Sequence, residues 1–155
     1  MRHTRDETTQ DDFVFRLVSE KEEYREGEKV KLYGEIEYIG EKEEVTIVHS
    51  SSAILISLEE KIRGYHIDGI VQDIGVTTTL KKGEPYRENY VKSRGSGPEE
   101  DPSYKIFMED FLKRDDFPAG YYVAKGYTDF FAKSGEVGEH VNIEANVDFK
   151  VLEND

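Results

Sequence analysis

Residues 118–127 have the sequence PAGYYVAKGY, in which a Pro-Ala-Gly corner leads directly into a tyrosine-rich, alternating segment. Proline fixes φ and glycine permits positive φ, so this corner suits an abrupt change of chain direction. Beyond it, Tyr122, Ala124 and Gly126 fall on one face of an extended chain, because side chains alternate along a strand. We expect the Tyr122 hydroxyl to hydrogen-bond across the corner, a structural role that tyrosines have in many β-sandwiches.

The same period of two is clearest near the end of the chain. Apolar residues occupy every second position from Val141 to Val151, with polar residues between them. This pattern, punctuated by Gly and Pro, is typical of half-buried antiparallel strands. Ser50, Ser51 and Ser52 form a polar break between two such segments. In all, the pattern predicts strands at residues 13–17, 29–39, 45–49, 54–58, 65–71, 76–80, 86–91, 121–131 and 141–151.

The period changes after residue 101. Asp101 suits a helix N-cap and Pro102 the first helical position. The apolar residues that follow form one helical stripe: Tyr104, Phe107, Met108, Phe111 and Leu112. We therefore predict one short helix, near residues 102–113. The alternative is a strand with Tyr104, Ile106 and Met108 facing inward.

Together these elements predict an all-β fold, an immunoglobulin-like antiparallel β-sandwich of seven to nine strands with one short helix. Strands and helices do not alternate, which argues against a parallel α/β sheet. A length of 155 residues suits one domain. Residues 1–12 are polar throughout and are expected to form a flexible tail, so the single domain is expected to span residues 13–152.

The composition narrows the possible partners. The chain has 34 acidic and 21 basic residues, a formal net charge of −13. This charge repels phosphate backbones and anionic lipids, so we expect no binding to nucleic acid. Solubility is the simplest interpretation of the charge, and a basic partner or a cation is the more specific one. No apolar run approaches the ~18 residues of a membrane helix, so no membrane insertion is expected.

Catalytic motifs are missing from the sequence. There is no cysteine, which excludes a disulfide framework, a thiolate metal site and a cysteine nucleophile. HExxH, Gly-x-Ser-x-Gly and glycine-rich phosphate-binding patterns do not occur either. His49 and the adjacent serines could be imagined as base and nucleophile, but neighbouring residues rarely provide that geometry. We expect no enzymatic activity and no cofactor.

The candidate binding site surrounds the most loop-like internal segment, residues 93–103. Tyrosine combined with Gly and Ser is typical of recognition surfaces. The candidate binding residues are Tyr86, Tyr90, Ser93, Arg94, Ser96 and Tyr104. The alternative is that these tyrosines pack over the edge of the sandwich.

The same loop carries acidic residues that suit a hard cation. Glu99, Glu100 and Asp101 provide carboxylate oxygens, the donors that Ca²⁺ prefers. No DxDxDG loop accompanies them, and acidic loops on an acidic protein are usually solvated. No metal site is therefore predicted, and these three residues remain as calcium candidates.

Three turns follow a recognisable order. Tyr24 precedes a Gly27-Glu28 turn, residues 80–84 read LKKGE, and residues 117–122 read FPAGYY. In this order the chain resembles the bacterial immunoglobulin-like domains typified by the intracellular proteinase inhibitor family of bacilli. The resemblance covers most of residues 13–152. It implies a proteinase inhibitor that acts through an exposed loop, for which residues 93–103 are the candidate.

From the sequence we therefore expect a non-catalytic bacterial β-sandwich module that binds another protein. The alternative is the proteinase inhibitor implied by the resemblance. A location in the cell envelope or outside the cell is favoured over the cytoplasm.

Overall fold

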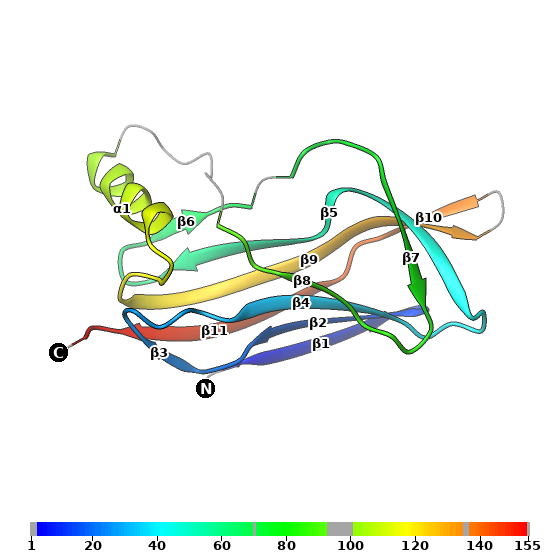
Figure 1. Cartoon of the computed structure of the whole chain (residues 1–155), viewed down its shortest axis with the longest axis horizontal. Coiled ribbons are helices and arrows are strands. Elements are labelled where there is room, and N and C mark those ends of the chain that lie inside the picture. Colours follow the sequence, from blue (N-terminus) through cyan, green and yellow to red (C-terminus); the bar gives the residue numbers. More distant parts are fainter. Residues whose placement is uncertain (1–2, 70, 93–100, 135–136, 155) are drawn as a thin grey trace.

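Two β-sheets pack face to face in the computed structural model of the chain, and one helix lies at one end (Figure 1). The structure describes residues 3–69, 71–92, 101–134 and 137–154. The expected β-sandwich with one short helix is confirmed. Among the described residues there are eleven strands, more than the expected seven to nine. No helix in this part of the chain is long and apolar enough to cross a membrane.

The four-stranded sheet has the order β1-β2-β4-β8, and every neighbouring pair is antiparallel. Its strands are β1 (Arg5–Gln10), β2 (Phe13–Ser19), β4 (Leu32–Tyr38) and β8 (Tyr86–Asn89). The expectation of a flexible tail over residues 1–12 is wrong for β1. Polar residues can form this strand because β1 lies at the edge of the sheet and is held to β2 by backbone hydrogen bonds.

The larger sheet has seven strands in a path β3-β11-β9-β5-β6, with β7 paired to β5 and β10 paired to β9. They are β3 (Glu23–Arg25), β5 (Glu44–Glu60), β6 (Tyr65–Ile67), β7 (Val76–Lys81), β9 (Gly120–Ser134), β10 (Val137–Val141) and β11 (Glu144–Leu152). The sheet is mixed, because β3 and β11 run parallel.

Strand β5 replaces two of the predicted strands. The serines at 50–52 do not break it, because they lie where its register with β9 shifts between His49 and Ile54. Such a bulge bends a strand without ending it. The backbone N–H of Ala53, freed by the bulge, donates to Glu88 on β8 (2.9 Å), which links the two sheets.

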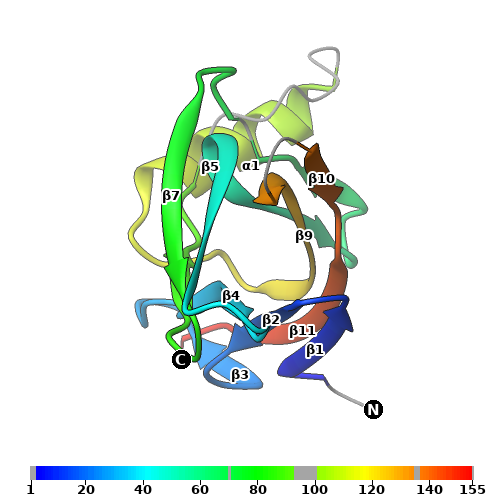
Figure 2. The same ribbon diagram turned by 90° about the vertical axis from the view of Figure 1, so that its right-hand side faces the viewer.

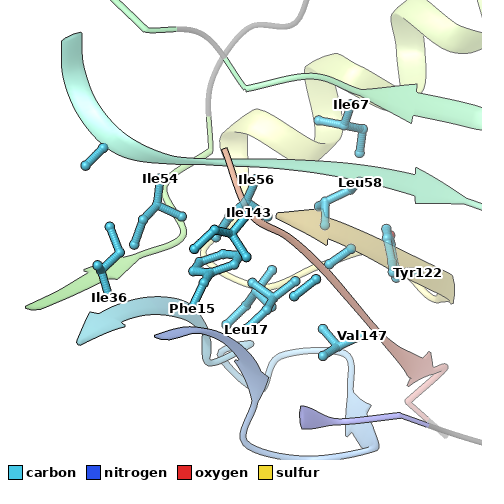
Figure 3. Close-up of a cluster of buried hydrophobic side chains, with 14 of the residues drawn as sticks. Phe15, Leu17, Ile36, Ile54, Ile56, Leu58, Ile67, Tyr122, Ile143 and Val147 are labelled. Atoms are coloured by element: carbon cyan, nitrogen blue, oxygen red, sulfur yellow. The ribbon is translucent and has the colours of Figure 1, made fainter. Parts of the chain in front are cut away.

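The predicted alternation of the last strand is confirmed. Its inward residues from Val141 to Val151 are all buried. The ladder is nevertheless interrupted between β10 and β11, where the Thr128 hydroxyl accepts the Ile143 N–H (2.9 Å). Figure 3 shows Ile143 and Val147 facing Phe15 and Leu17 of the opposite sheet within the core.

The corner before β9 has the predicted hydrogen bond. Tyr122 is fully buried, and its hydroxyl donates to the Pro118 carbonyl (2.8 Å). Just before the corner, the Phe117 ring contacts four other rings. Their centroids lie 5.0–6.0 Å from it, and they belong to Tyr90, Phe111, Tyr122 and Phe149.

Helix α1 (Pro102–Lys113) is also confirmed, and the alternative of a strand is wrong. The Asp101 carboxylate accepts the Ser103 N–H (3.0 Å) as an N-cap. The predicted stripe is buried except for Leu112, which is partly buried, whereas Ile106 is 69% exposed. The helix therefore covers one end of the core with its apolar face.

We predict that Tyr122→Phe lowers the free energy of unfolding by about 1–2 kcal/mol, because it leaves the buried Pro118 carbonyl without its donor. Urea denaturation measures the difference. Tyr127→Phe is the matched control, since no hydrogen bond of its hydroxyl occurs among the described residues, and it should change stability by less than about 0.5 kcal/mol. Equal effects of the two substitutions would contradict a structural role of the corner bond.

Candidate functional site

The three tyrosines of the predicted binding site take part in packing. Tyr104 is 6% exposed, and its hydroxyl donates to the His66 carbonyl (2.8 Å). The Tyr86 hydroxyl donates to Glu88 (2.8 Å), and burial raises the pKa of Tyr86. Burial also raises the pKa of Tyr90, whose ring packs on Phe117. The alternative interpretation, packing over the sandwich edge, therefore describes these side chains better.

Of the remaining predicted site residues, only Asp101 lies within the described ranges. Ser93, Arg94 and Ser96 lie outside the described residues, as do the calcium candidates Glu99 and Glu100. Asp101, the third candidate, is the helix N-cap. Within the described ranges, no group of three or more His, Asp or Glu side chains is arranged to hold a metal ion.

Tyr90 does line a small groove at the side of the sandwich. The groove has a volume of about 310 Å³ and lies between β8 with the two residues after it and the middle of β5. Ile54, Leu55 and Ile56 line one wall, and the exposed Val91 lines the other. Tyr90 is the one predicted binding residue among those described that lines this groove.

Lys92 fastens the chain after β8 to the end of helix α1. Its Nζ donates to the carbonyls of Phe111 (2.6 Å), Arg114 (2.7 Å) and Asp116 (2.6 Å). Burial lowers the pKa of Lys92 to about 8. The three carbonyls use all three ammonium protons, so this perturbed lysine has a structural role.

Ion pairs fasten the same end of the helix to the turn after β3. Arg114 donates to the carboxylates of Asp116 (2.8 Å), Asp110 (3.0 Å) and Glu26. Asp116 also accepts the Gly27 N–H (2.6 Å). The Arg114 guanidinium is the main cause that holds the pKa of Asp116 well below its usual range.

Buried carboxylates with perturbed pKa values are candidates for acid or base catalysis, and Glu60 is fully buried. It accepts the backbone N–H groups of Ile62 (2.7 Å) and Arg63 (2.9 Å), and also the Arg63 side chain (2.9 Å). Burial raises its pKa, but these hydrogen bonds outweigh burial, and the pKa is lowered. Glu60 is therefore a charged anchor of the β5–β6 turn.

The structure does not arrange His49 as a base for the hydroxyl groups of the adjacent serines, because both ring nitrogens have other partners. His49 is 7% exposed. Its Nδ1 lies 2.6 Å from the Ser50 carbonyl oxygen, which can only accept, so Nδ1 carries the proton. Its Nε2 then accepts from the Thr78 hydroxyl (2.8 Å). Nδ1 is thus bonded within β5, and Nε2 links β5 to β7.

Charges on the outer face of the four-stranded sheet pair with one another. Glu7, Arg16, Glu35 and Arg87 stand opposite each other in a row across β1, β2, β4 and β8. Arg87 pairs with Glu35 (2.8 Å), and Arg16 pairs with Glu7 and with Glu37 (2.9 Å). Because these charges are matched within the chain, this face offers little to a charged partner.

The outer face formed by β7, β5, β9 and β10 is different. Phe131 is 52% exposed and is the one Phe or Tyr side chain in the described part of the chain that is left exposed. Its ring lies 4.9 Å from that of His140. Val48 and Thr77 continue this row across the sheet. We call this surface the threonine–phenylalanine face, defined by Thr46, Val48, Thr77, Thr79, Phe131 and His140.

Next to this face, the sandwich opens into a groove of about 700 Å³. This end groove lies between the β1–β2 turn, the β4–β5 turn and strands β9 and β10, at the end shown in Figure 2. Thr46 lines it and also belongs to the threonine–phenylalanine face. The side chains that line the groove are those of Asp12, Phe13, Tyr38, Glu41, Lys42, Glu44, Val45, Thr46, Ala132, Lys133 and Glu139.

Comparisons with known proteins do not indicate what these surfaces bind. No protein-family model matches the chain, and no curated protein matches it. The functional argument therefore depends on the residues of this chain.

Sequence reasoning missed the threonine–phenylalanine face, although the sequence contains a signal for it. Phe130 and Phe131 are adjacent in a segment predicted to be a strand. Because side chains alternate, one of the two rings must point away from the core. The structure places Phe130 inside and Phe131 outside. No comparable signal exists for the end groove, because its walls come from four distant segments.

We predict that Asp116→Asn lowers the free energy of unfolding by about 1–3 kcal/mol at neutral pH, because hydrogen bonds to charged groups have this magnitude. The lowered pKa of Asp116 means that its contribution is complete above its ordinary value of 3.8. The contribution is lost as the pH falls from there towards the lower pKa of the folded state.

Urea denaturation of both proteins between pH 7 and pH 2 tests this prediction. The difference in stability should be constant above about pH 5 and should shrink below about pH 4. Comparing the two proteins cancels the titration of the other carboxylates. A difference that stays constant down to pH 2 would contradict the role given to the ion pair.

Proposed function

We propose that this chain is a non-catalytic module that binds another protein through the threonine–phenylalanine face. The observation that carries the proposal is the exposed Phe131 ring, which lies among β-branched side chains on an outer sheet face. Protein interfaces are enriched in aromatic residues and depleted of charge at their centres. The opposite outer face, with its paired charges, lacks these properties.

The arrangement of the strands supports the same surface. The face lies on a continuous antiparallel ladder of β7, β5, β9 and β10, so its side chains are held on a rigid support. A rigid aromatic anchor loses little conformational entropy on binding. The His140 ring beside Phe131 is in turn held by Asp129 (2.7 Å), which limits the movement of this pair.

The partner can be sought with the folded protein as bait in bacterial lysate and envelope fractions. We expect Phe131→Ala to lose a protein that the wild type retains, with affinity reduced at least about tenfold when the purified partner is titrated. Phe131 is half exposed, so the variant should keep the wild-type unfolding midpoint.

Ile106→Ala is the matched control, because Ile106 is an exposed apolar residue on helix α1, outside the proposed face. It should retain the partner. If the two variants and the wild type retain the same proteins, the threonine–phenylalanine face is not the binding surface. A captured proteinase that the module inhibits would instead favour the inhibitor function implied by the family resemblance.

A further inference from the structure

The end groove combines an apolar floor with an acidic rim. Phe13, Tyr38 and Ala132 are at most 6% exposed and form the floor, where the rings of Phe13 and Tyr38 lie 5.7 Å apart. The exposed rim residues are Asp12, Glu41, Lys42, Glu44, Lys133 and Glu139. The acids outnumber the lysines on this rim, so the groove is negative at its mouth.

One part of the rim holds carboxyl groups close together. The nearby carboxyl groups of Asp11 and Asp12 in the β1–β2 turn, Asp11 foremost, raise the pKa of Glu139 on β10. A cation at this position would relieve the repulsion between these carboxyl groups.

The size and chemistry of the groove suit a long side chain with a cationic head. A volume of about 700 Å³ lies within the range of ordinary ligand sites, about 300–1,000 Å³. Lysine and arginine place their apolar stems along hydrophobic surface while the charged head remains at a polar rim. The planar guanidinium also stacks on aromatic rings and binds carboxylates in a bidentate manner.

We propose that the end groove binds an arginine side chain of a basic, extended peptide segment. The alkyl stem lies along the partly exposed Val45 and Thr46 above the buried floor, and the guanidinium meets the carboxylates of Asp12 and Glu139. The net charge of −13 attracts such a segment over a longer range. This site is separate from the Phe131 ring, so it does not depend on the function proposed for the threonine–phenylalanine face.

Titration calorimetry with a synthetic peptide tests the proposal. The probe is acetyl-Gly-Arg-Gly-Arg-Gly-amide, and its counterpart carries citrulline, which is nearly isosteric with arginine but uncharged. We expect saturable binding of the arginine peptide and at least tenfold weaker binding of the citrulline peptide. The double variant Asp12→Asn, Glu139→Gln should weaken binding of the arginine peptide at least tenfold.

The double variant Glu109→Gln, Glu153→Gln is the matched control. It removes the same charge from helix α1 and the C-terminal segment, at the other end of the molecule (Figure 1), and should bind as the wild type does. All four substituted side chains are exposed, so both variants should keep the unfolding midpoint of the wild type.

The pH dependence provides a second readout. The facing groups are Asp11 and Asp12 from the β1–β2 turn, Glu41, Lys42 and Glu44 from the β4–β5 segment, and Lys133 and Glu139 from β9 and β10. Because the pKa of Glu139 is raised, this group loses its negative charge at a higher pH than an ordinary carboxyl group does. The arginine peptide should therefore bind more tightly at pH 7 than at pH 5.

Three results would overturn the proposal. They are no binding of the arginine peptide at millimolar concentration, equal weakening by the two double variants, or equal affinity for the arginine and citrulline peptides. Binding of Ca²⁺ alone that is lost in the groove variant, without peptide binding, would assign a cation site in its place.

Discussion

The cluster of aromatic rings around Phe117 joins parts of the fold that backbone hydrogen bonds leave separate. Ladder hydrogen bonds run within a sheet, so they cannot hold one sheet to the other or the helix to either. Phe117 contacts Phe111 of the helix, Tyr122 and Phe149 of the larger sheet, and Tyr90 directly after β8. Each such aromatic pair contributes about 0.5–1.5 kcal/mol beyond the burial of its surface. The corner that follows Phe117 fixes the position of this ring, because the Tyr122 hydroxyl ties the chain back to Pro118.

The two ends of the sandwich differ because only one of them carries the helix. At the helical end, Lys92 and Arg114 bind the carbonyls and carboxylates at the helix terminus, and these charged groups are used within the chain. At the other end, Asp12 and Glu139 remain on the rim of an open groove above the Phe13 and Tyr38 rings. Charged groups are therefore structural at one end and accessible to a ligand at the other. This difference explains why both proposed binding surfaces lie away from the helix.

Elements with a strong local pattern could be predicted from the sequence, and elements stabilised by distant segments could not. The helix was predictable because Asp101 and Pro102 mark its start and one apolar stripe marks its buried face. The burial pattern from Val141 to Val151 followed from alternation. Strand β1 was missed because an edge strand of polar residues depends on the ladder of its neighbour. The tyrosines Tyr86, Tyr90 and Tyr104 gave an ambiguous signal, since an amphipathic ring suits both a binding surface and a packed edge.

The sequence by itself determined the period of each strand, the position of the helix, the corner at residues 118–122 and the excess of negative charge. These properties depend on neighbouring residues or on composition, so a single chain reveals them. Only the tertiary structure decided that Phe131 faces outward while Phe130 faces the core, and that Asp12, Tyr38 and Glu139 meet around one groove. The physical reason is that register and sheet packing bring together residues far apart in sequence, and local pattern carries no information about which distant segments will meet.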